Sequence, residues 1–159
     1  MRIIRIAFIC FCVGILCACC QGEHPSENST QKLHIGLHKL TIGDKDVYVE
    51  IANSHASRSF GLMQRKSLPQ DEGMIFVYPE ADFRSFWMKD TLIPLSLAYI
   101  DRNGRIFQLV DMEPLDESSH PSTEPAQFAL EVNQGWFEKN GIKVGDTVAN
   151  LPSAEGAEE

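Results

Sequence analysis

The chain of 159 residues is 43% hydrophobic and 23% charged, which is the balance of an ordinary globular protein rather than of a disordered or wholly membrane-embedded one. Its length allows one domain with a single core. The net charge of −8 argues against nucleic acid as a partner, because proteins that bind nucleic acid carry a basic face.

The cysteines are confined to the start of the chain, at Cys10, Cys12, Cys17, Cys19 and Cys20. The rest of the chain therefore lacks the residues for a disulfide, a thiolate nucleophile or a Cys-ligated metal. We expect a domain that folds by packing alone, with no metal and no cofactor.

The first 20 residues have the layout of a signal peptide. Two arginines precede an apolar run from Ile6 to Leu16, which is too short for a comfortable transmembrane helix. The string Leu16-Cys17-Ala18-Cys19 resembles the bacterial lipobox, in which the cysteine is lipidated and becomes the first residue of the mature protein. We expect residues 1–18 to be a signal peptide and Cys19 to anchor the protein to a membrane of the cell envelope, facing the periplasm or the exterior. An uncleaved apolar anchor and a plain secretory signal are the alternatives.

Two polar segments flank the expected domain. Residues 19–31 contain no large apolar side chain beyond the cysteines, so they are predicted to form a flexible tether. The acidic residues 153–159 are predicted to be a disordered tail for the same reason. The globular domain is therefore expected to span residues 32–152.

The domain opens with the pattern of a β-hairpin. Leu33 to Ile42 and Val47 to Ile51 alternate apolar and polar residues, and Gly43-Asp44 between them fits a tight turn. Further on, Met74 to Tyr78 is a continuous apolar run, as in a strand covered on both faces.

A helix is predicted between these strands, after the N-cap Asn53-Ser54. Arg58 and Arg65 lie seven residues apart on one side of it, where they either clamp an anion or form an exposed face. Gly61 within the helix suggests the close approach of another element. Apolar residues occur at the spacing of one buried helical face, namely Ala56, Phe60 and Met63.

The stretch around Trp87 is the most distinctive part of the chain, because large apolar side chains stand directly beside charged ones. Regular alternation from Ser85 to Asp90 puts Trp87 and Lys89 on one face of a strand and Phe86 and Met88 on the other. Phe86 and Met88 are apolar throughout and are predicted to enter the core. Trp87 and Lys89 are then left toward a cleft or the surface.

The remaining chain predicts more β structure. Leu95 to Ile100 and Arg105 to Val110 form a hairpin around the turn from Asp101 to Gly104. The long segment from Asp111 to Pro125 is either a functional lid or a mobile loop. Gln127 to Asn133 alternates again, with Glu131 on the face opposite the apolar residues.

A short helix ending at Asn140-Gly141 and a last strand from Ile142 to Val148 complete the domain. Asn133 is a candidate cap for the start of this helix. Many short strands with two short helices predict a mainly β (α+β) fold, a small antiparallel β-barrel or sandwich.

Seven short motifs are spread along this domain: Arg58-x-x-Gly61-Leu62-Met63-x-Arg65, Gly73-Met74-Ile75-Phe76, Phe86-Trp87-Met88-Lys89-Asp90-Thr91, Ile93-Pro94-Leu95, Asp101 to Gly104, Leu130-Glu131-Val132 and Gly141-Ile142-x-x-Gly145-Asp146. From Val47 to Val148 they resemble the domain of unknown function 192 (DUF192) family. The resemblance implies a small, mainly β single domain, often exported, with no established biochemical activity. Family members commonly have Asn where this chain has Asp90, Asp where it has Ser96, and Tyr where it has His120.

A ligand site is predicted around Trp87. An aromatic ring beside a cation is a common way to bind a sugar or another polar ring with one apolar face, whereas the alternative is a core tryptophan. Glu131 can meet Lys89 if their two strands are neighbours. We therefore expect Trp87, Lys89 and Glu131 to line one ligand-competent surface.

Two classes of function remain open. No titratable residues stand at a spacing that compels them to meet, so no catalytic residue is assigned. The favoured prediction is a non-catalytic envelope module that binds a small molecule or glycan. The alternative is a small hydrolase or lyase acting on envelope polymers.

Overall fold

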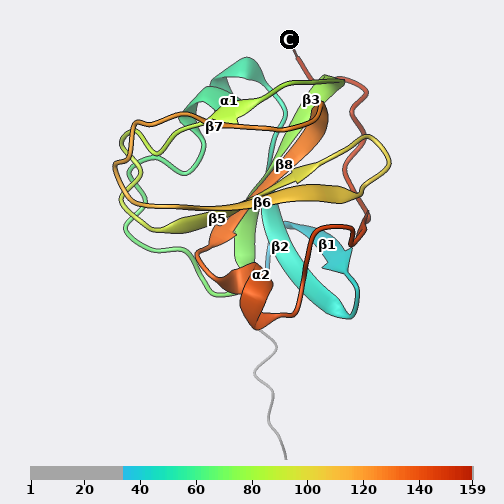
Figure 1. Ribbon diagram of the computed structural model, residues 1–159, viewed down its shortest axis with the longest axis horizontal. Coiled ribbons are helices and arrows are strands. Elements are labelled where there is room, and N and C mark those ends of the chain that lie inside the picture. Colours follow the sequence, from blue (N-terminus) through green and yellow to red (C-terminus); the bar gives the residue numbers. More distant parts are fainter. Residues whose placement is uncertain (1–33, 159) are drawn as a thin grey trace, which may run out of the picture. The chain divides into compact units, whose positions relative to one another are not determined.

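The computed structural model describes residues 34–158, and the expected signal peptide, Cys19 and tether lie outside these residues. Nine strands and two short helices follow one another in the described residues (Figure 1). In chain order they are β1 (His38–Ile42), β2 (Lys45–Ala52), α1 (His55–Phe60), β3 (Glu72–Asp82), β4 (Ser85–Phe86), β5 (Leu95–Ile100), β6 (Ile106–Met112), β7 (His120–Pro121), β8 (Ala126–Asn133), α2 (Trp136–Lys139) and β9 (Val148–Ala149).

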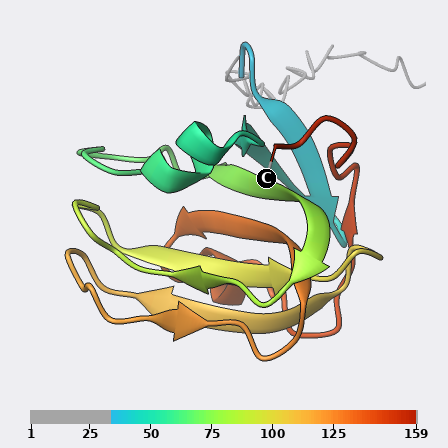
Figure 2. The ribbon, with the colours of Figure 1, turned by 90° about the horizontal axis from the view of Figure 1, so that it is seen from above.

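Seven of the strands form one sheet in the order β6-β5-β8-β3-β2-β1-β9, and β4 pairs with β7 in a separate two-stranded sheet. The large sheet curls so that its edges approach each other (Figure 2). Arg105, just before β6, forms a bridge with Thr147, just before β9, and the Val148 N–H donates to the Gly104 carbonyl at 2.8 Å. The predicted fold class, mainly β with a barrel-like sheet and two short helices, is confirmed.

The sheet is not antiparallel throughout. β2 and β3 run parallel, in register from the pair Tyr48 and Glu72 to the pair Ala52 and Phe76. The chain crosses from the end of β2 to the start of β3 through α1 and an irregular turn, which is the connection that a parallel pair requires. Local sequence patterns did not indicate this crossover.

Each hairpin was predicted from its turn, and both are present. β1 and β2 pair from His38 opposite Val49 to Ile42 opposite Lys45. Gly43 between them has φ 62°, a left-handed conformation that glycine adopts without a steric penalty. β1 begins at His38, five residues later than the alternation from Leu33 suggested.

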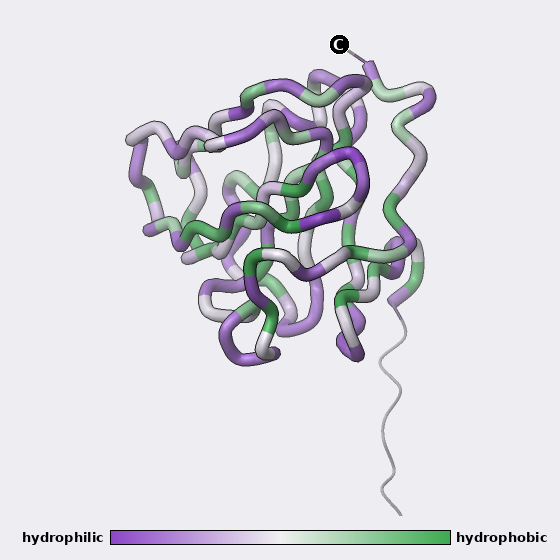
Figure 3. The backbone as a smooth tube through the Cα atoms, turned by 45° about the vertical axis from the view of Figure 1, so that its right-hand side comes forward, coloured by the Kyte–Doolittle hydropathy of each residue, from purple (hydrophilic) through white to green (hydrophobic). Residues whose placement is uncertain are grey.

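Apolar side chains pack on both faces of the large sheet, in line with the hydropathy pattern along the strands in Figure 3. β3 lies between β2 and β8, so its successive side chains enter opposite clusters. Ile75 and Val77 join one cluster, whereas Met74 and Phe76 join the other. The prediction that this run is covered on both faces is confirmed.

Helix α1 differs from its prediction. The Ser54 hydroxyl caps its start by accepting from the Ser57 N–H at 3.1 Å, but none of the helical residues is buried. The helix ends at Gly61, where φ is 51° and a Cβ would lie 3.3 Å from the Phe76 ring. Phe60 is 55% exposed, so the predicted buried face was wrong. Leu62, beyond the helix end, makes the buried contact instead.

The second helix and the last strand are also shorter than predicted. α2 ends at Asn140 as expected, but it starts after Gly135. Asn133 does not cap it, because the Asn133 side-chain amide donates to the carbonyls of Leu68 and Pro69. Neither α1 nor α2 within residues 34–158 is long and apolar enough to cross a membrane.

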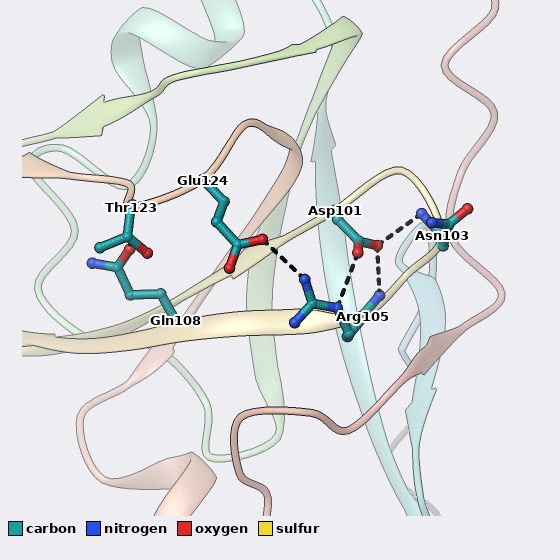
Figure 4. A network of polar contacts seen from close by, with 6 residues as sticks. All are labelled: Asp101, Asn103, Arg105, Gln108, Thr123 and Glu124. Atoms are coloured by element: carbon teal, nitrogen blue, oxygen red, sulfur yellow. Dashed lines mark hydrogen bonds and ion pairs between the residues drawn. The ribbon is translucent and has the colours of Figure 1, made fainter.

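The long segment after β6 is tied to the domain by polar contacts (Figure 4). Arg105 joins Asp101 at 3.2 Å and Glu124 at 3.0 Å, and Gln108 contacts the Pro121 carbonyl and the Thr123 N–H. The Tyr99 hydroxyl also donates to the His120 carbonyl. These bonds, with the pairing of β7 to β4, fasten the segment along its length.

The end of the chain also lies against the domain. Ala154 and Ala157 pack on the core cluster that contains Leu40 and Val148, and the Glu158 N–H donates to the Asn53 carbonyl at 2.9 Å. The sequence predicted a disordered acidic tail from residue 153. Two alanines among its acidic residues, Ala154 and Ala157, make the apolar contact described above.

Candidate functional site

The stretch around Trp87 forms a regular strand over two residues only. β4 consists of Ser85 and Phe86, which pair with Pro121 and His120 of β7. Phe86 is 8% exposed and Met88 is fully buried, whereas Trp87 is 49% exposed. The alternation of buried and exposed side chains therefore follows the prediction, although regular strand geometry ends at Phe86.

The residues after Met88 form a tight turn rather than the end of a strand. Asp90 has φ 54°, and its carbonyl accepts a hydrogen bond from the Gln64 N–H at 2.8 Å. Among residues with a Cβ, Asn and Asp enter this left-handed region most readily. Asp90 therefore meets a backbone requirement of this turn.

A pocket of about 370 Å³ opens beside Trp87, between α1, the end of β3 and β4. This volume is at the lower end of the range that small-molecule sites occupy. Aromatic and cationic side chains dominate its lining, with two serines at its rim. The residues are His55, Arg58, Ser59, Tyr78, Pro79, Arg84, Ser85, Phe86 and Trp87.

A smaller cavity of about 40 Å³ adjoins this pocket and shares four lining residues with it, Arg58, Ser59, Phe86 and Trp87. The turn after α1 lines it, and Phe76 and Thr91 form other parts of its wall. Its volume has room for about three water molecules. Glu131 of β8 also lines this inner cavity.

Glu131 is a buried carboxyl group without a partner. Its side chain is 4% exposed, and among residues 34–158 it has no hydrogen-bond or ion-pair partner. Burial raises the pKa of Glu131 to about 8, because the charged form loses its hydration without a compensating contact. The group is therefore mainly protonated at neutral pH, when it can both donate and accept a hydrogen bond.

The outer pocket has the opposite electrostatic character. The guanidinium carbons of Arg84 and Arg58 lie 4.0 Å and 4.9 Å from the centre of the Tyr78 ring. Burial raises the pKa of Tyr78, and the two guanidinium groups partly oppose this shift. Two cations thus flank one aromatic ring in a protein whose net charge is −8.

Lys89 does not line either cavity. Its ammonium nitrogen lies 5.2 Å from the centre of the Trp87 ring, within the range of a cation–π contact. The predicted meeting with Glu131 required neighbouring strands, but β8 pairs with β3 and β5 whereas β4 pairs with β7. Of the three predicted site residues, the structure brings Trp87 and Glu131 to one cavity and leaves Lys89 outside it.

Sequence reasoning missed Arg84, Tyr78 and His55 as pocket residues. It paired Arg58 with Arg65, but Arg65 binds the Glu50 carboxylate through two contacts of 2.6 Å. The position of Arg84, directly before the stretch that contains Phe86 and Trp87, could have indicated its role. Its convergence with Arg58 on Tyr78 depends on the fold, because the three residues come from different elements.

Ser96 and His120, which the sequence analysis also singled out, make contacts within the fold. The Ser96 hydroxyl donates to Asp111 and accepts from the Gly135 N–H at 2.9 Å, so it joins β5 to β6 and to the start of α2. His120 contributes its carbonyl to Tyr99, and this contact does not depend on the side chain. Neither residue lines the pocket beside Trp87.

The comparisons with known proteins agree with this architecture. A protein of Sinorhizobium meliloti 1021, described as a candidate transcription regulator, has 30% identity and a TM-score of 0.69, with 70% of this chain and 92% of that chain covered. A protein of unknown function from Novosphingobium aromaticivorans DSM 12444 has 33% identity and a TM-score of 0.68, with 70% and 84% covered. No curated protein matches. The sequence profile of the DUF192 family, described as "Uncharacterized ACR", matches residues 38–150. This chain belongs to the DUF192 family.

Proposed function

We propose that this protein is a small-molecule-binding module of the bacterial cell envelope, with its ligand held between Trp87 and Glu131. The observation that carries the proposal is the Glu131 carboxyl group, which is 4% exposed, unpartnered, and faces a cavity that adjoins the pocket beside Trp87. A polar group largely removed from water without a hydrogen-bond partner lowers stability, by up to about 1–3 kcal/mol where it is fully buried. A ligand that satisfies this group recovers part of that cost on binding.

Trp87 supplies the other half of the proposed site. Half of its side chain is exposed, and the neighbouring residue Phe86 is fixed by ring contacts at 4.9 Å to Phe76 and 5.8 Å to Tyr99. An exposed aromatic face on a rigid base suits a ligand ring with one apolar face. The ligand is therefore expected to stack on Trp87 and to direct a polar group toward Glu131.

A small hydrolase or lyase is the second candidate function. The raised pKa of Glu131 favours it, because a carboxyl group that stays protonated near neutral pH can act as a general acid. Hydrolysis of a glycosidic bond ordinarily uses two carboxyl groups on either side of the bond. The residues that line the two cavities contribute one, Glu131, so binding without chemistry is the preferred function.

The proposed location rests on the N-terminal sequence. The lipobox-like string ending at Cys19 supports a lipid anchor, and the polar residues that follow it would tether the domain to the membrane. Cys19→Ser should release the protein into the soluble fraction. Retention in the membrane with an unprocessed mass would contradict the lipid anchor.

The Sinorhizobium neighbour is described as a candidate transcription regulator, but the charge of this chain does not favour DNA as its ligand. A regulator that binds DNA needs a basic surface, and this chain has 22 acidic against 14 basic residues. The two arginines beside Tyr78 are recessed in a pocket, which suits a small anion better than a duplex.

The binding proposal is tested by thermal shift of the purified protein against a panel of envelope sugars and metabolites. A ligand at 100 times its Kd adds about 2.7 kcal/mol of stability. Trp87→Ala should abolish the shift, whereas Phe83→Ala should retain it, because Phe83 is similarly exposed but does not line the pocket. Equal shifts in the two variants would place the ligand elsewhere.

A further inference from the structure

We propose that the ligand is an acidic sugar, whose carboxylate or phosphate group binds Arg84 and Arg58 while its ring stacks on Trp87. This inference rests on the proposed function and names the ligand class of the same pocket. It starts from the two arginines, which the binding proposal itself does not require.

Arg84 is positioned but not neutralised. Its Nη2 donates to the Glu80 carbonyl at 2.8 Å, and its guanidinium group stacks on Tyr78. Its Nε is buried and has no hydrogen-bond partner. No carboxylate among residues 34–158 pairs with it. Among the described residues Nη1 has no hydrogen-bond partner either, and it is not buried, so the guanidinium group keeps a donor that an incoming oxyanion can reach.

Arg58 is held in the same way, by neutral groups only. Its Nη1 donates at 3.0 Å to the carbonyls of Asn53 and Val77, and its Nη2 donates to the Glu158 carbonyl. Carbonyl oxygens orient the guanidinium group without cancelling its charge. Arg58 therefore adds a second fixed positive charge to the pocket that contains Arg84.

Two arginines outside the pocket are paired with carboxylates, unlike Arg58 and Arg84. Arg65 pairs with Glu50 at 2.6 Å, and Arg105 pairs with both Asp101 and Glu124. The chain has 22 acidic residues against 14 basic ones, so carboxylates outnumber the cations that could pair with them. That the pocket arginines lack one, while lying beside the same tyrosine, is the pattern of a site that receives its anion from outside.

Glu131 is compatible with an anionic ligand because its carboxyl group is protonated. An ionised carboxylate in the adjoining cavity would repel the ligand, whereas burial raises the pKa of Glu131 to about 8 and keeps the group neutral. A neutral carboxyl group can exchange hydrogen bonds with a sugar hydroxyl. Ser59 and Ser85 add further hydroxyl groups to the pocket lining. A ring with an acidic group and several hydroxyls fits this set.

The test is a fluorescence titration of the purified protein at constant ionic strength with four probes: glucuronic acid, glucose 6-phosphate, glucose and benzoate. Glucose is the neutral match of the two acidic sugars, and benzoate has a charge and a flat face but no hydroxyls. The signal is the emission change that disappears in Trp87→Phe, which isolates Trp87 from the buried Trp136.

At least one acidic sugar is expected to bind tenfold or more tightly than both glucose and benzoate, and the better of the two identifies carboxylate or phosphate as the preferred group. Arg84→Gln should remove this preference, whereas Arg102→Gln, an equal change of charge at an exposed turn, should retain it.

Glucose binding as tightly as the acidic sugars would overturn this inference and leave the proposed function standing. Benzoate binding as tightly as they do would overturn the assignment to sugars. If no sugar on the wider panel gives a signal that depends on Trp87, both proposals fail.

Discussion

Glu131→Gln should stabilise the protein above pH 5, by an amount that grows with pH. The substitution keeps the size of the side chain and removes its ability to ionise. Glu131 titrates at a pKa of about 8 in the folded protein against 4.5 for an unperturbed carboxyl group, and the cause is burial. At 1.36 kcal/mol for each unit of difference, the full effect reaches about 5 kcal/mol.

The direction follows from which state releases its proton first. Below pH 4.5 Glu131 is protonated in both the folded and the unfolded chain, so its contribution to stability is fully retained. Between pH 4.5 and about 8 the unfolded chain ionises while the folded one does not, and stability falls by about 1.4 kcal/mol per pH unit. Above that range the loss is complete. Glutamine titrates in neither state, so the variant escapes this loss.

The assay is urea unfolding followed by circular dichroism at pH 4, 6 and 8, with the free energy of unfolding taken from each transition. The wild-type and variant proteins should agree within about 1 kcal/mol at pH 4 and diverge by several kcal/mol at pH 8. Glu138→Gln, an exposed change of the same kind in α2, serves as the control and should follow the wild type. A constant difference between Glu131→Gln and wild type at all three values would refute the argument, because it would mean that Glu131 is solvated or paired.

Further predictions concern the packing of the core and the ability of the domain to fold without residues 1–31. Phe86→Ala should cost about 3–5 kcal/mol of unfolding free energy, whereas Trp87→Ala should cost clearly less, because Phe86 is buried and Trp87 is half exposed; equal losses in chemical denaturation would mean that Trp87 belongs to the core. Gly73→Ala should lower the melting temperature strongly, since its Cβ would lie 2.3 Å from the Glu131 carbonyl on the neighbouring strand, and an unchanged melt would contradict that close approach. Deletion of Met1–Gln31 should leave a cooperative melt that EDTA does not change; a fall of several degrees with the chelator would reveal a metal site.

The parts of the fold that sequence reasoning predicted depend on neighbouring residues. The turns at Gly43 and Gly104 need only a positive φ, which the glycines supply locally. The inward side chains of Phe86 and Met88 follow from the pleat of an extended chain. Such features are set within a few residues and can be recognised from the residue pattern.

The parts that it missed depend on which strands become neighbours. Lys89 was placed beside Glu131 on the assumption of adjacent strands, but β8 lies between β3 and β5, which gives Glu131 other neighbours. For the same reason the meeting of Arg58 and Arg84 at Tyr78 could not be predicted. Strand order is decided by long-range pairing, on which periodicity within a single strand carries no information.

A crystal structure of the protein grown with the tightest-binding compound of the panel would test the proposed Trp87–Glu131 site most directly. We expect a ring stacked on Trp87, with a polar atom within about 3.2 Å of the Glu131 carboxyl group. Density for the compound at another place on the protein, with the cavity beside Glu131 unchanged, would contradict it.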